Sequence, residues 1–341
     1  MRWNARRPPP TGQVWTQSEP HGSLEAESQS GRVDSEVDMD VSVRRAQREK
    51  VRFDSGGAEC VAWHYPGRGS ACVVMAGGFA VPKGPGTDRF AARFQEAGFH
   101  VLAFDFRGLG ESGEGPCPVV SPRSQLADWA AALAFAPSLP GVDAGRLALW
   151  GFSATGGQVL DVAASEPGVS AVVAQTPGLG GPSAGVNAAR YQSPLAMARL
   201  LGRGLVDEIG SRLGRPSRAV PLSGRRGEVA VLTTPDAVVT PSPLDQNGSY
   251  PEWRQVVAAR SALRLAFASS GRHVSRVRCP LLVVVCDDDR SAPPAPALTA
   301  AGRAPRAEVL HLPGGHYAPF LAEHERAVEA EVAFLKRYLT A

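Results

Sequence analysis

Apolar segments that are typical of buried strands alternate with helical segments from residue 90 onward, and this alternation restricts the possible folds more than any other feature. The strand-like segments are residues 100–104, 147–150, 170–174, 281–285 and 308–312. Helical patterns separate most of them, at residues 90–97, 125–136, 156–164 and 297–301. Strands joined through helices pair in parallel, so the pattern predicts an α/β fold: a mostly parallel central sheet with helices on both faces.

The two ends of the chain depart from this alternation. Three β-rich segments, 51–53, 59–64 and 72–75, lie between turn residues and predict an antiparallel start to the sheet. Residues 326–338 have the apolar spacing of an amphipathic helix. Residues 1–45 are rich in Pro, Gly, Ser and Glu and have no apolar periodicity. We therefore expect a disordered N-terminal tail, followed by one domain over residues 46–341.

The alternation also stops between residue 176 and about residue 271. This segment has a Gly- and Pro-rich beginning, and helices are expected at 194–213 and around 251–268. The strand pattern resumes at Leu281, so we interpret residues 176–271 as an insertion that forms a helical cap over the sheet, and not as an independent domain.

The composition excludes several classes of protein. The formal net charge is +3, but the basic residues are almost all arginine and are scattered, so no nucleic-acid partner is expected. No apolar run reaches the ~18 residues of a membrane-spanning helix, and no apolar segment follows the basic N-terminus, so we expect a cytoplasmic protein. Five cysteines without Cys-x-x-Cys spacing indicate neither a disulfide framework nor a metal site.

The strongest chemical signal lies in residues 147–160, where a strand runs into the sequence WGFSATGG and then into a helix. A serine on such a sharp turn is exposed as a nucleophile, and its neighbours must be small because larger side chains would collide across the bend. Gly151 meets this requirement, whereas Thr155 stands where glycine is usual. The alternative is an ordinary helix N-terminus that Ser153 caps.

A nucleophilic serine requires a histidine base and a carboxylate that orients the histidine. Three acids, Asp287, Asp288 and Asp289, directly follow the apolar strand 281–285. His316 follows the strand that ends near residue 312, and the Gly314-Gly315 pair allows a sharp bend that brings the imidazole back over the sheet. The alternative for the three acids is a solvated turn.

These motifs occur in an order that resembles the α/β-hydrolase-fold serine hydrolases, from about Lys50 to the C-terminus. The resemblance rests on residues 76–79 (AGGF), 104–112 (FDFRGLGES), 127–129 (ADW), 151–157, 286–293 and 314–316. It is greatest to the capped branch that includes dienelactone-hydrolase-like esterases and the acyltransferases and thiohydrolases of polyketide pathways. The acid spacing of that family selects Asp289. The resemblance also implies an oxyanion hole formed by the backbone N–H groups of Phe79 and Ala154.

The chain departs from the family pattern at Gly77, where histidine is usual, and at Thr155. Because the hole uses backbone N–H groups, neither departure removes it, but both leave the rate and the substrate class open. The resemblance makes Arg107 part of a loop scaffold that pairs with an acid. Five residues of the insertion either line an apolar substrate pocket or simply pack the cap onto the body: Met197, Leu200, Leu201, Tyr250 and Trp253.

We therefore expect hydrolysis of a carboxylic ester, thioester or lactone through an acyl-serine intermediate, without a metal or an organic cofactor. Ser153 is the expected nucleophile, His316 the base and Asp289 the orienting acid, and the partner is a small-molecule acyl substrate. Two alternatives remain: an acyltransferase that uses the same three residues, and a non-catalytic ligand-binding protein on the hydrolase scaffold. The sequence leaves the oligomeric state open, a homodimer included.

Overall fold

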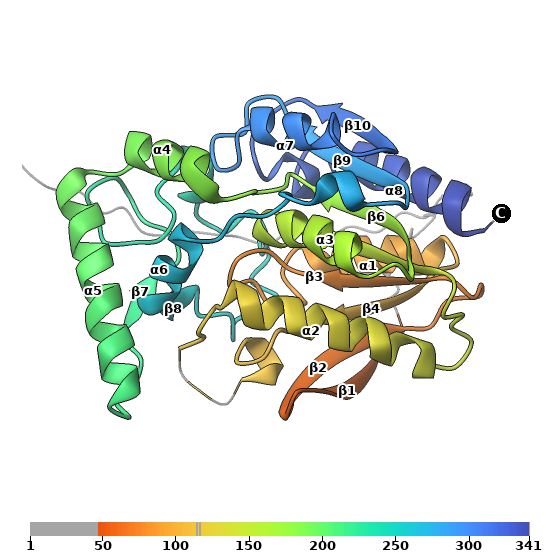
Figure 1. The fold of residues 1–341 in the computed structure, drawn as a ribbon, viewed down its shortest axis with the longest axis horizontal. Helices are drawn as coiled ribbons and strands as arrows, with labels where there is room; N and C mark the ends of the chain where they lie inside the picture. Colours follow the sequence, from red (N-terminus) through yellow and green to blue (C-terminus); the bar gives the residue numbers. More distant parts are fainter. Residues whose placement is uncertain (1–46, 114, 116, 341) are drawn as a thin grey trace, which may run out of the picture. The chain divides into compact units, whose positions relative to one another are not determined.

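An eight-stranded sheet lies at the centre of the structure, in the order β1-β2-β4-β3-β5-β6-β9-β10 (Figure 1). The computed structural model describes residues 47–113, 115 and 117–340, so the tail expected at residues 1–45 lies outside the described residues. The strands of the sheet are β1 (Glu49–Ser55), β2 (Ala58–Tyr65), β3 (Cys72–Ala76), β4 (His100–Phe104), β5 (Leu147–Phe152), β6 (Val169–Gln175), β9 (Leu281–Cys286) and β10 (Ala307–Leu312).

The sheet is mostly parallel, as the alternation predicts. Only β1 and β2 run against their neighbours, since β2 is antiparallel to both β1 and β4. The strand β3 was expected in the antiparallel start, but it pairs in parallel with β4 and β5. The reason is the helix after it, α1 (Thr87–Glu96), which carries the chain back to the start of β4.

Helices cover both faces of the sheet and form two apolar cores. One face packs against α2 (Pro122–Phe135), α3 (Ala154–Ser165) and α7 (Pro294–Ala301), and the other against α1 and α8 (His324–Leu339). All residues of β3, β4, β5 and β9 are buried. Burial on both faces explains why these strands are continuous apolar runs and not alternating ones.

The chain between β6 and β9 forms elements that do not join the main sheet. They are α4 (Gly181–Tyr191), α5 (Pro194–Arg212), β7 (Ala219–Pro221), β8 (Val256–Ala258) and α6 (Arg260–Ala266). The strands β7 and β8 pair with each other in antiparallel fashion. Figure 1 shows α4 and α5 on the left, outside the layers of the sheet and its helices. We call residues 176–271 the insertion.

Two expectations about the insertion were wrong in detail. A helix was expected around residues 251–268, but the structure has β8 followed by the shorter α6. Gln255 adopts φ 50°, which interrupts a helix, and the β-branched Val256 and Val257 then pair with β7. The helix α4 was not expected, because two glycines and a proline in its sequence disfavour helix formation.

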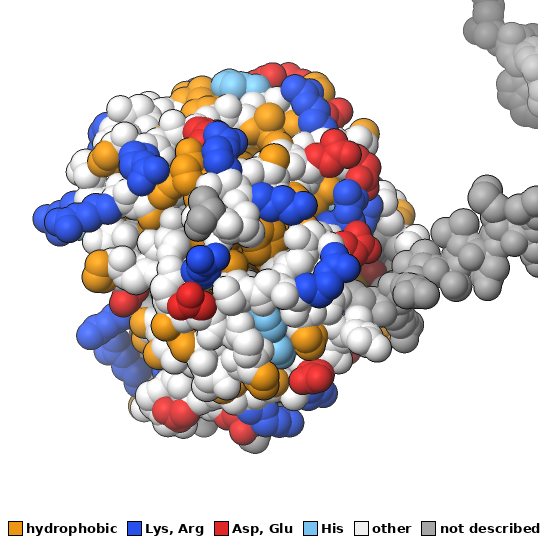
Figure 2. Space-filling view, turned by 90° about the vertical axis from the view of Figure 1, so that its right-hand side faces the viewer, with side chains coloured by type: hydrophobic (Ala, Val, Ile, Leu, Met, Phe, Trp, Pro, Cys, Tyr) orange, Lys and Arg blue, Asp and Glu red, His pale blue; other side chains and the backbone are white. Residues whose placement is uncertain are grey.

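Figure 2 shows how charge is distributed over one face of the protein. Basic and acidic side chains are interspersed on the face that Figure 2 shows, without a broad region of one sign. Among the described helices, none combines the length and apolar character that crossing a bilayer requires.

Candidate active site

Ser153 lies on a sharp turn between a strand and a helix. The strand β5 ends at Phe152 and α3 begins at Ala154, and Ser153 between them adopts φ 59° and ψ −121°. A non-glycine residue rarely has a positive φ, and such strain is typical of exposed nucleophiles on this kind of turn. A Cβ at Gly151 would lie 2.5 Å from the carbonyl oxygen of Thr155, so the bend requires glycine at that position.

Thr155 fits into this turn although glycine is usual there. Its buried hydroxyl accepts a hydrogen bond from the backbone N–H of Phe152 at 3.0 Å and donates one to the carbonyl oxygen of the same residue at 2.8 Å. The threonine side chain therefore bridges the bend and leaves no polar atom of its own unpaired.

Three side chains predicted from the sequence form one line of hydrogen bonds. His316 Nε2 lies 2.9 Å from Ser153 Oγ, and His316 Nδ1 lies 2.7 Å from Asp289 Oδ2. The second oxygen of Asp289 accepts a hydrogen bond from the backbone N–H of Ala292 at 2.6 Å. Ser153 follows β5, Asp289 follows β9 and His316 follows β10, so the carboxyl edge of the parallel sheet brings them together.

Of the three consecutive acids, only Asp289 is buried and contacts His316. Asp287 and Asp288 are exposed, and Asp287 instead bonds to His311 on β10, with Oδ1 and Nδ1 2.8 Å apart. The expected bend before His316 is present, since Gly314 adopts φ 88°, which favours glycine.

The imidazole of His316 is enclosed by aromatic rings and carboxylates. The rings of Phe152 and Tyr317 both lie with their centroids 5.0 Å from that of His316, which is only 2% exposed. Burial by itself lowers the pKa of His316, but the negative charge of Asp289 and, more weakly, that of Asp236 outweigh it and raise this pKa above its usual value. The site therefore favours the imidazolium that forms when a base accepts a proton.

Asp236, a residue of the insertion, also belongs to the site. Its carboxylate accepts hydrogen bonds from the backbone N–H groups of His316, Arg290 and Ser291 at 3.2–3.3 Å, and from the Ser291 hydroxyl at 2.7 Å. Burial would raise the pKa of Asp236, but these donors and the neighbouring His316 hold it below the usual range. Sequence reasoning missed Asp236, because nothing in its local pattern indicates contact with loops more than fifty residues away.

Phe79 and Ala154, the residues expected to form an oxyanion hole, lie at the same cavity as Ser153. The N–H groups of Phe79 and Ala154 have no hydrogen-bond acceptor within the described part of the chain, and both residues line the cavity that contains Ser153. Gly77 stands where the family usually has histidine, and the reason is steric, because a Cβ there would lie 2.6 Å from the carbonyl oxygen of Val81. The loop that carries Phe79 is thus closely packed despite its glycines.

The cavity that contains Ser153 has a volume of about 200 Å³ and is mostly apolar. Trp253 lines it, as one of the two interpretations of this residue predicted. Leu200 belongs to an apolar cluster that also includes Phe79 and Ala80, Leu201 is exposed, and Tyr250 donates a hydrogen bond to Asp88 at 2.6 Å. The mostly apolar lining favours contact with apolar groups. Within the described residues, no cluster of His, Cys, Asp or Glu side chains is arranged to hold a metal ion.

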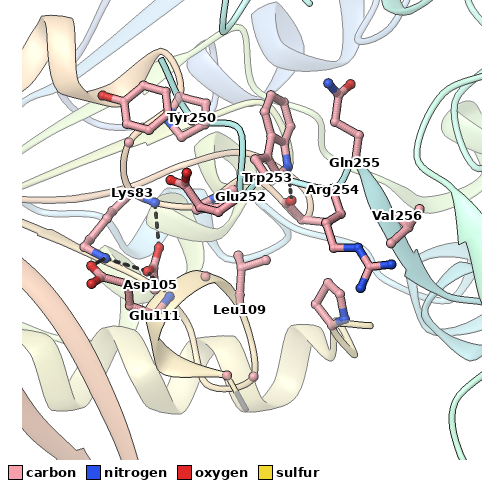
Figure 3. Close-up of a pocket in the computed structure, with 18 of the residues that line it drawn as sticks. Lys83, Asp105, Leu109, Glu111, Tyr250, Glu252, Trp253, Arg254, Gln255 and Val256 are labelled. Atoms are coloured by element: carbon pink, nitrogen blue, oxygen red, sulfur yellow. Dashed lines mark hydrogen bonds and ion pairs between the residues drawn. The ribbon is translucent and has the colours of Figure 1, made fainter. Parts of the chain in front are cut away.

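A second, larger cavity of about 520 Å³ is lined by Ala80 and residues 82–85, among others, and does not contain Ser153 (Figure 3). Lys83, at its wall, pairs with the buried Asp105 at 2.7 Å and also with Glu111. Trp253 lines both cavities, and its indole N–H donates a hydrogen bond to the carbonyl oxygen of Ala80 at 3.2 Å. Trp253 therefore forms part of the partition between the two spaces.

Arg107, in the segment 104–112, belongs to a loop scaffold, as expected. Arg107 pairs with the buried Asp128 at 2.6 Å and also donates to the Ser55 hydroxyl. These contacts tie the end of β1 to α2 and do not reach Ser153.

Comparison with known proteins places this arrangement in a family. A model described as "Alpha/beta hydrolase family" matches residues 54–331. The chain belongs to this family. The finding confirms both the predicted fold class and the resemblance on which the sequence interpretation rested.

Individual relatives differ in how much of the chain they share. Quorum-quenching protein AidA of Acinetobacter baumannii is 36% identical over 292 residues, which are 84% of this chain and 94% of the relative. Thiohydrolase apmlB of Arthrinium phaeospermum is 34% identical over 131 residues, 38% of this chain and 43% of that one. The solved structure of the DcsB complex with its substrate analogue superimposes with a TM-score of 0.70 at 22% identity, covering 86% of this chain and all of the other, which shows the shared fold.

Proposed function

We propose that this member of the alpha/beta hydrolase family is a serine hydrolase that cleaves a carboxylic ester, thioester or lactone through an acyl-serine intermediate. The observation that carries the proposal is the continuous line of hydrogen bonds from Ser153 through His316 to Asp289. A nucleophile, a base and an orienting acid in this geometry supply the groups that acyl transfer requires.

In the first half of the reaction, Ser153 Oγ attacks the carbonyl carbon while His316 Nε2 accepts its proton. Asp289 holds the imidazole by its Nδ1–H and stabilises the imidazolium. The tetrahedral intermediate then collapses, and its leaving alcohol or thiol takes the proton from His316. In the second half, water attacks the acyl-serine with His316 again acting as base, and the acid is released.

The N–H groups of Phe79 and Ala154 are the proposed donors to the oxyanion of each tetrahedral intermediate. Their lack of protein acceptors supports this role, because donors already paired would have to reorganise. Loss of one such donor typically costs ~2.7–4 kcal/mol of barrier.

The substrate class follows from the cavity and from two relatives. The apolar lining favours an acyl group of limited size, since the cavity holds about 200 Å³. The relative named as a thiohydrolase makes a thioester a suitable test substrate, and the relative named as a quorum-quenching protein adds quorum-sensing signal molecules to the screen. These names support the choice of probes and leave the substrate of this chain to the experiment.

A fluorophosphonate probe and intact-mass measurement test the proposal directly. We expect one label on the wild-type protein and none on Ser153→Ala, with ester turnover lowered by roughly 10⁶ in kcat. Ser223→Ala is the matched control, because Ser223 lines the same cavity but contacts neither His316 nor Asp289. Labelling of folded Ser153→Ala, or unchanged turnover, would contradict the proposal and favour a ligand-binding role.

Turnover of one ester with and without an added alcohol or amine distinguishes hydrolysis from acyl transfer. Hydrolysis predicts the free acid as the product under both conditions. If the main product were instead the acyl group joined to the added alcohol or amine, the protein would be an acyltransferase with the same acyl-serine intermediate.

A further inference from the structure

The outward face of α5 is apolar along its whole length. Of the eleven large hydrophobic residues that are exposed in the described chain, six lie between residues 195 and 213. They are Leu195, Leu201, Leu205, Val206, Ile209 and Leu213, exposed by 39–67%. Their spacing, together with Ala198 and Gly202, follows the helical repeat and puts them on one side of the helix.

The opposite side of α5 is fixed to the insertion and leaves the apolar face outside. Ala196, Leu200, Gly204 and Asp207 are buried. Gly204 allows close contact with α6, since a Cβ there would lie 2.8 Å from Leu263 Cγ. Asp207 pairs with Arg260 at 3.2 Å. These contacts leave the outer side chains exposed, and a continuous exposed apolar patch is typical of a surface that contacts a partner or a membrane.

Arginines border this face and give it a positive charge. Arg199 and Arg203 follow one edge of the apolar stripe, and Arg212 lies at the other edge. Arg199 and Arg203 are exposed and have no ion-pair partner among the described residues. Both acids of this helix are already paired: Asp207 with Arg260, and Glu208 with Arg212 at 3.6 Å and Arg264 at 3.1 Å.

This charge distribution disfavours a second copy of the chain as the occupant. In a two-fold pair of antiparallel α5 helices, the same edge of each helix meets its symmetry equivalent. Arg199 and Arg203 would then face the same arginines of the other copy, with no free acid to compensate. An anionic surface removes this repulsion and pairs with the arginines instead.

We propose that α5 is a docking surface for an anionic lipid bilayer, with its apolar face inserted between the headgroups. A helix with an apolar face and arginines at its borders has the features of helices that lie in a membrane interface. A groove of about 370 Å³ between the end of α5 and residues 213–218, lined by Arg215 and Arg218 among others, offers a lipid phosphate a place next to this face.

The lipid contact does not depend on the proposed function, but one consequence does. The neighbouring helix α4 contributes Ala184 and Ala188 to the cavity that contains Ser153. Docking through the insertion would therefore bring acyl substrates that dissolve in membranes near the proposed nucleophile.

Sedimentation of the full chain with phosphatidylcholine vesicles, with and without phosphatidylglycerol, tests the proposal. We expect the protein to bind the anionic vesicles with an affinity that falls as the salt concentration rises. Binding to vesicles without phosphatidylglycerol should be weaker by a factor of about ten or more. Leu205→Ser/Ile209→Ser should abolish binding, and Arg199→Gln/Arg203→Gln should weaken it about tenfold or more. Val309→Ser is the control, because Val309 is an exposed apolar residue on β10, and circular dichroism verifies folding.

Two outcomes would overturn the proposal. One is equal binding, or none, with the two kinds of vesicle. The other is a wild-type dimer in light scattering that Leu205→Ser/Ile209→Ser converts to a monomer, because a second copy would then cover the face. None of these measurements uses catalysis, so they separate a failure of this proposal from a failure of the proposed hydrolase.

Discussion

Asp236 accepts a hydrogen bond from the backbone N–H of His316 at 3.3 Å, although eighty positions separate the two residues in the sequence. The same carboxylate binds the Ser291 hydroxyl at 2.7 Å, two residues after Asp289. One side chain of the insertion thus holds both loops that carry the proposed base and its orienting acid. This makes Asp236 a positioning residue, because it acts on the loops and on the charge around His316.

The first prediction concerns Asp236→Asn. The negative charge of Asp236 is one of the influences that raise the pKa of His316, so its removal should lower that pKa. A base acts in its neutral form, and the acidic limb of the kcat/KM profile should therefore move to lower pH. A purely structural role would lower kcat without moving the limb.

Asp287→Asn is the matched control for this profile, since Asp287 is an exposed carboxylate that pairs with His311. Its acidic limb should coincide with that of the wild type. An acidic limb of Asp236→Asn that stays in place, or moves to higher pH, would contradict the assignment.

The second prediction compares three neighbouring acids. Asp289→Asn should preserve the fold but lower kcat by roughly 10⁴, because an amide at this position no longer holds His316 in the productive tautomer. Asp287→Asn and Asp288→Asn should change kcat only slightly, since both side chains are exposed and neither contacts His316. Steady-state assays on one ester, with circular dichroism as the folding control, decide between them. A crippled Asp288→Asn beside an active Asp289→Asn would reassign the acid.

Local sequence patterns predict much of the fold and of the candidate site. The buried strands are continuous apolar runs separated by helical segments, so the positions and the parallel pairing of most of them follow from this alternation, whereas β3 was assigned to the antiparallel start. Ser153 and Asp289 each follow a buried strand, and His316 follows the partly exposed β10. Parallel strands end at one edge, so the proximity of the three residues could be anticipated. The family spacing was needed to choose Asp289 among three adjacent acids.

The insertion was predicted less well because its structure depends on contacts between distant segments. The short strand β8 forms only because β7 supplies hydrogen bonds from about forty residues away, and no local pattern contains that partner. Asp236 lies in a single 3₁₀ turn, and its role comes from the approach of two loops of the main sheet. The apolar face of α5 resembles an ordinary core stripe until the structure shows which side is exposed.

The third prediction concerns the threonine in the nucleophile turn. Thr155→Val keeps the shape of the side chain but removes the hydroxyl that pairs with both the N–H and the carbonyl oxygen of Phe152. A buried N–H left without an acceptor costs about 1–3 kcal/mol, so urea denaturation should show a loss of this size in the free energy of unfolding. Thr155→Ser retains the hydroxyl and should lose much less. Equal losses in the two variants would show that the methyl group, and not the hydrogen bonds, matters at this position.

The last prediction concerns Glu331 on α8, which is fully buried and accepts a hydrogen bond from the indole N–H of Trp150 at 2.9 Å. Burial raises the pKa of Glu331 to about 8, and the Trp150 donor opposes this only in part. In the unfolded chain a glutamate titrates near pH ~4.3, so between that pH and about 8 the folded state binds more protons than the unfolded state. The free energy of unfolding should therefore fall as pH rises through this window.

Glu331→Gln removes the titrating group but keeps an oxygen that can accept from Trp150. Urea denaturation should be carried out at about pH 6, within this window, and at about pH 9, above it. The free energy of unfolding should decline less between these pH values for the variant than for the wild type, by at least about 1 kcal/mol. Glu329→Gln is the control, because Glu329 is an exposed carboxylate on the same helix, and its decline should match that of the wild type. Declines that are the same in all three proteins would mean that Glu331 does not keep its proton in the folded state.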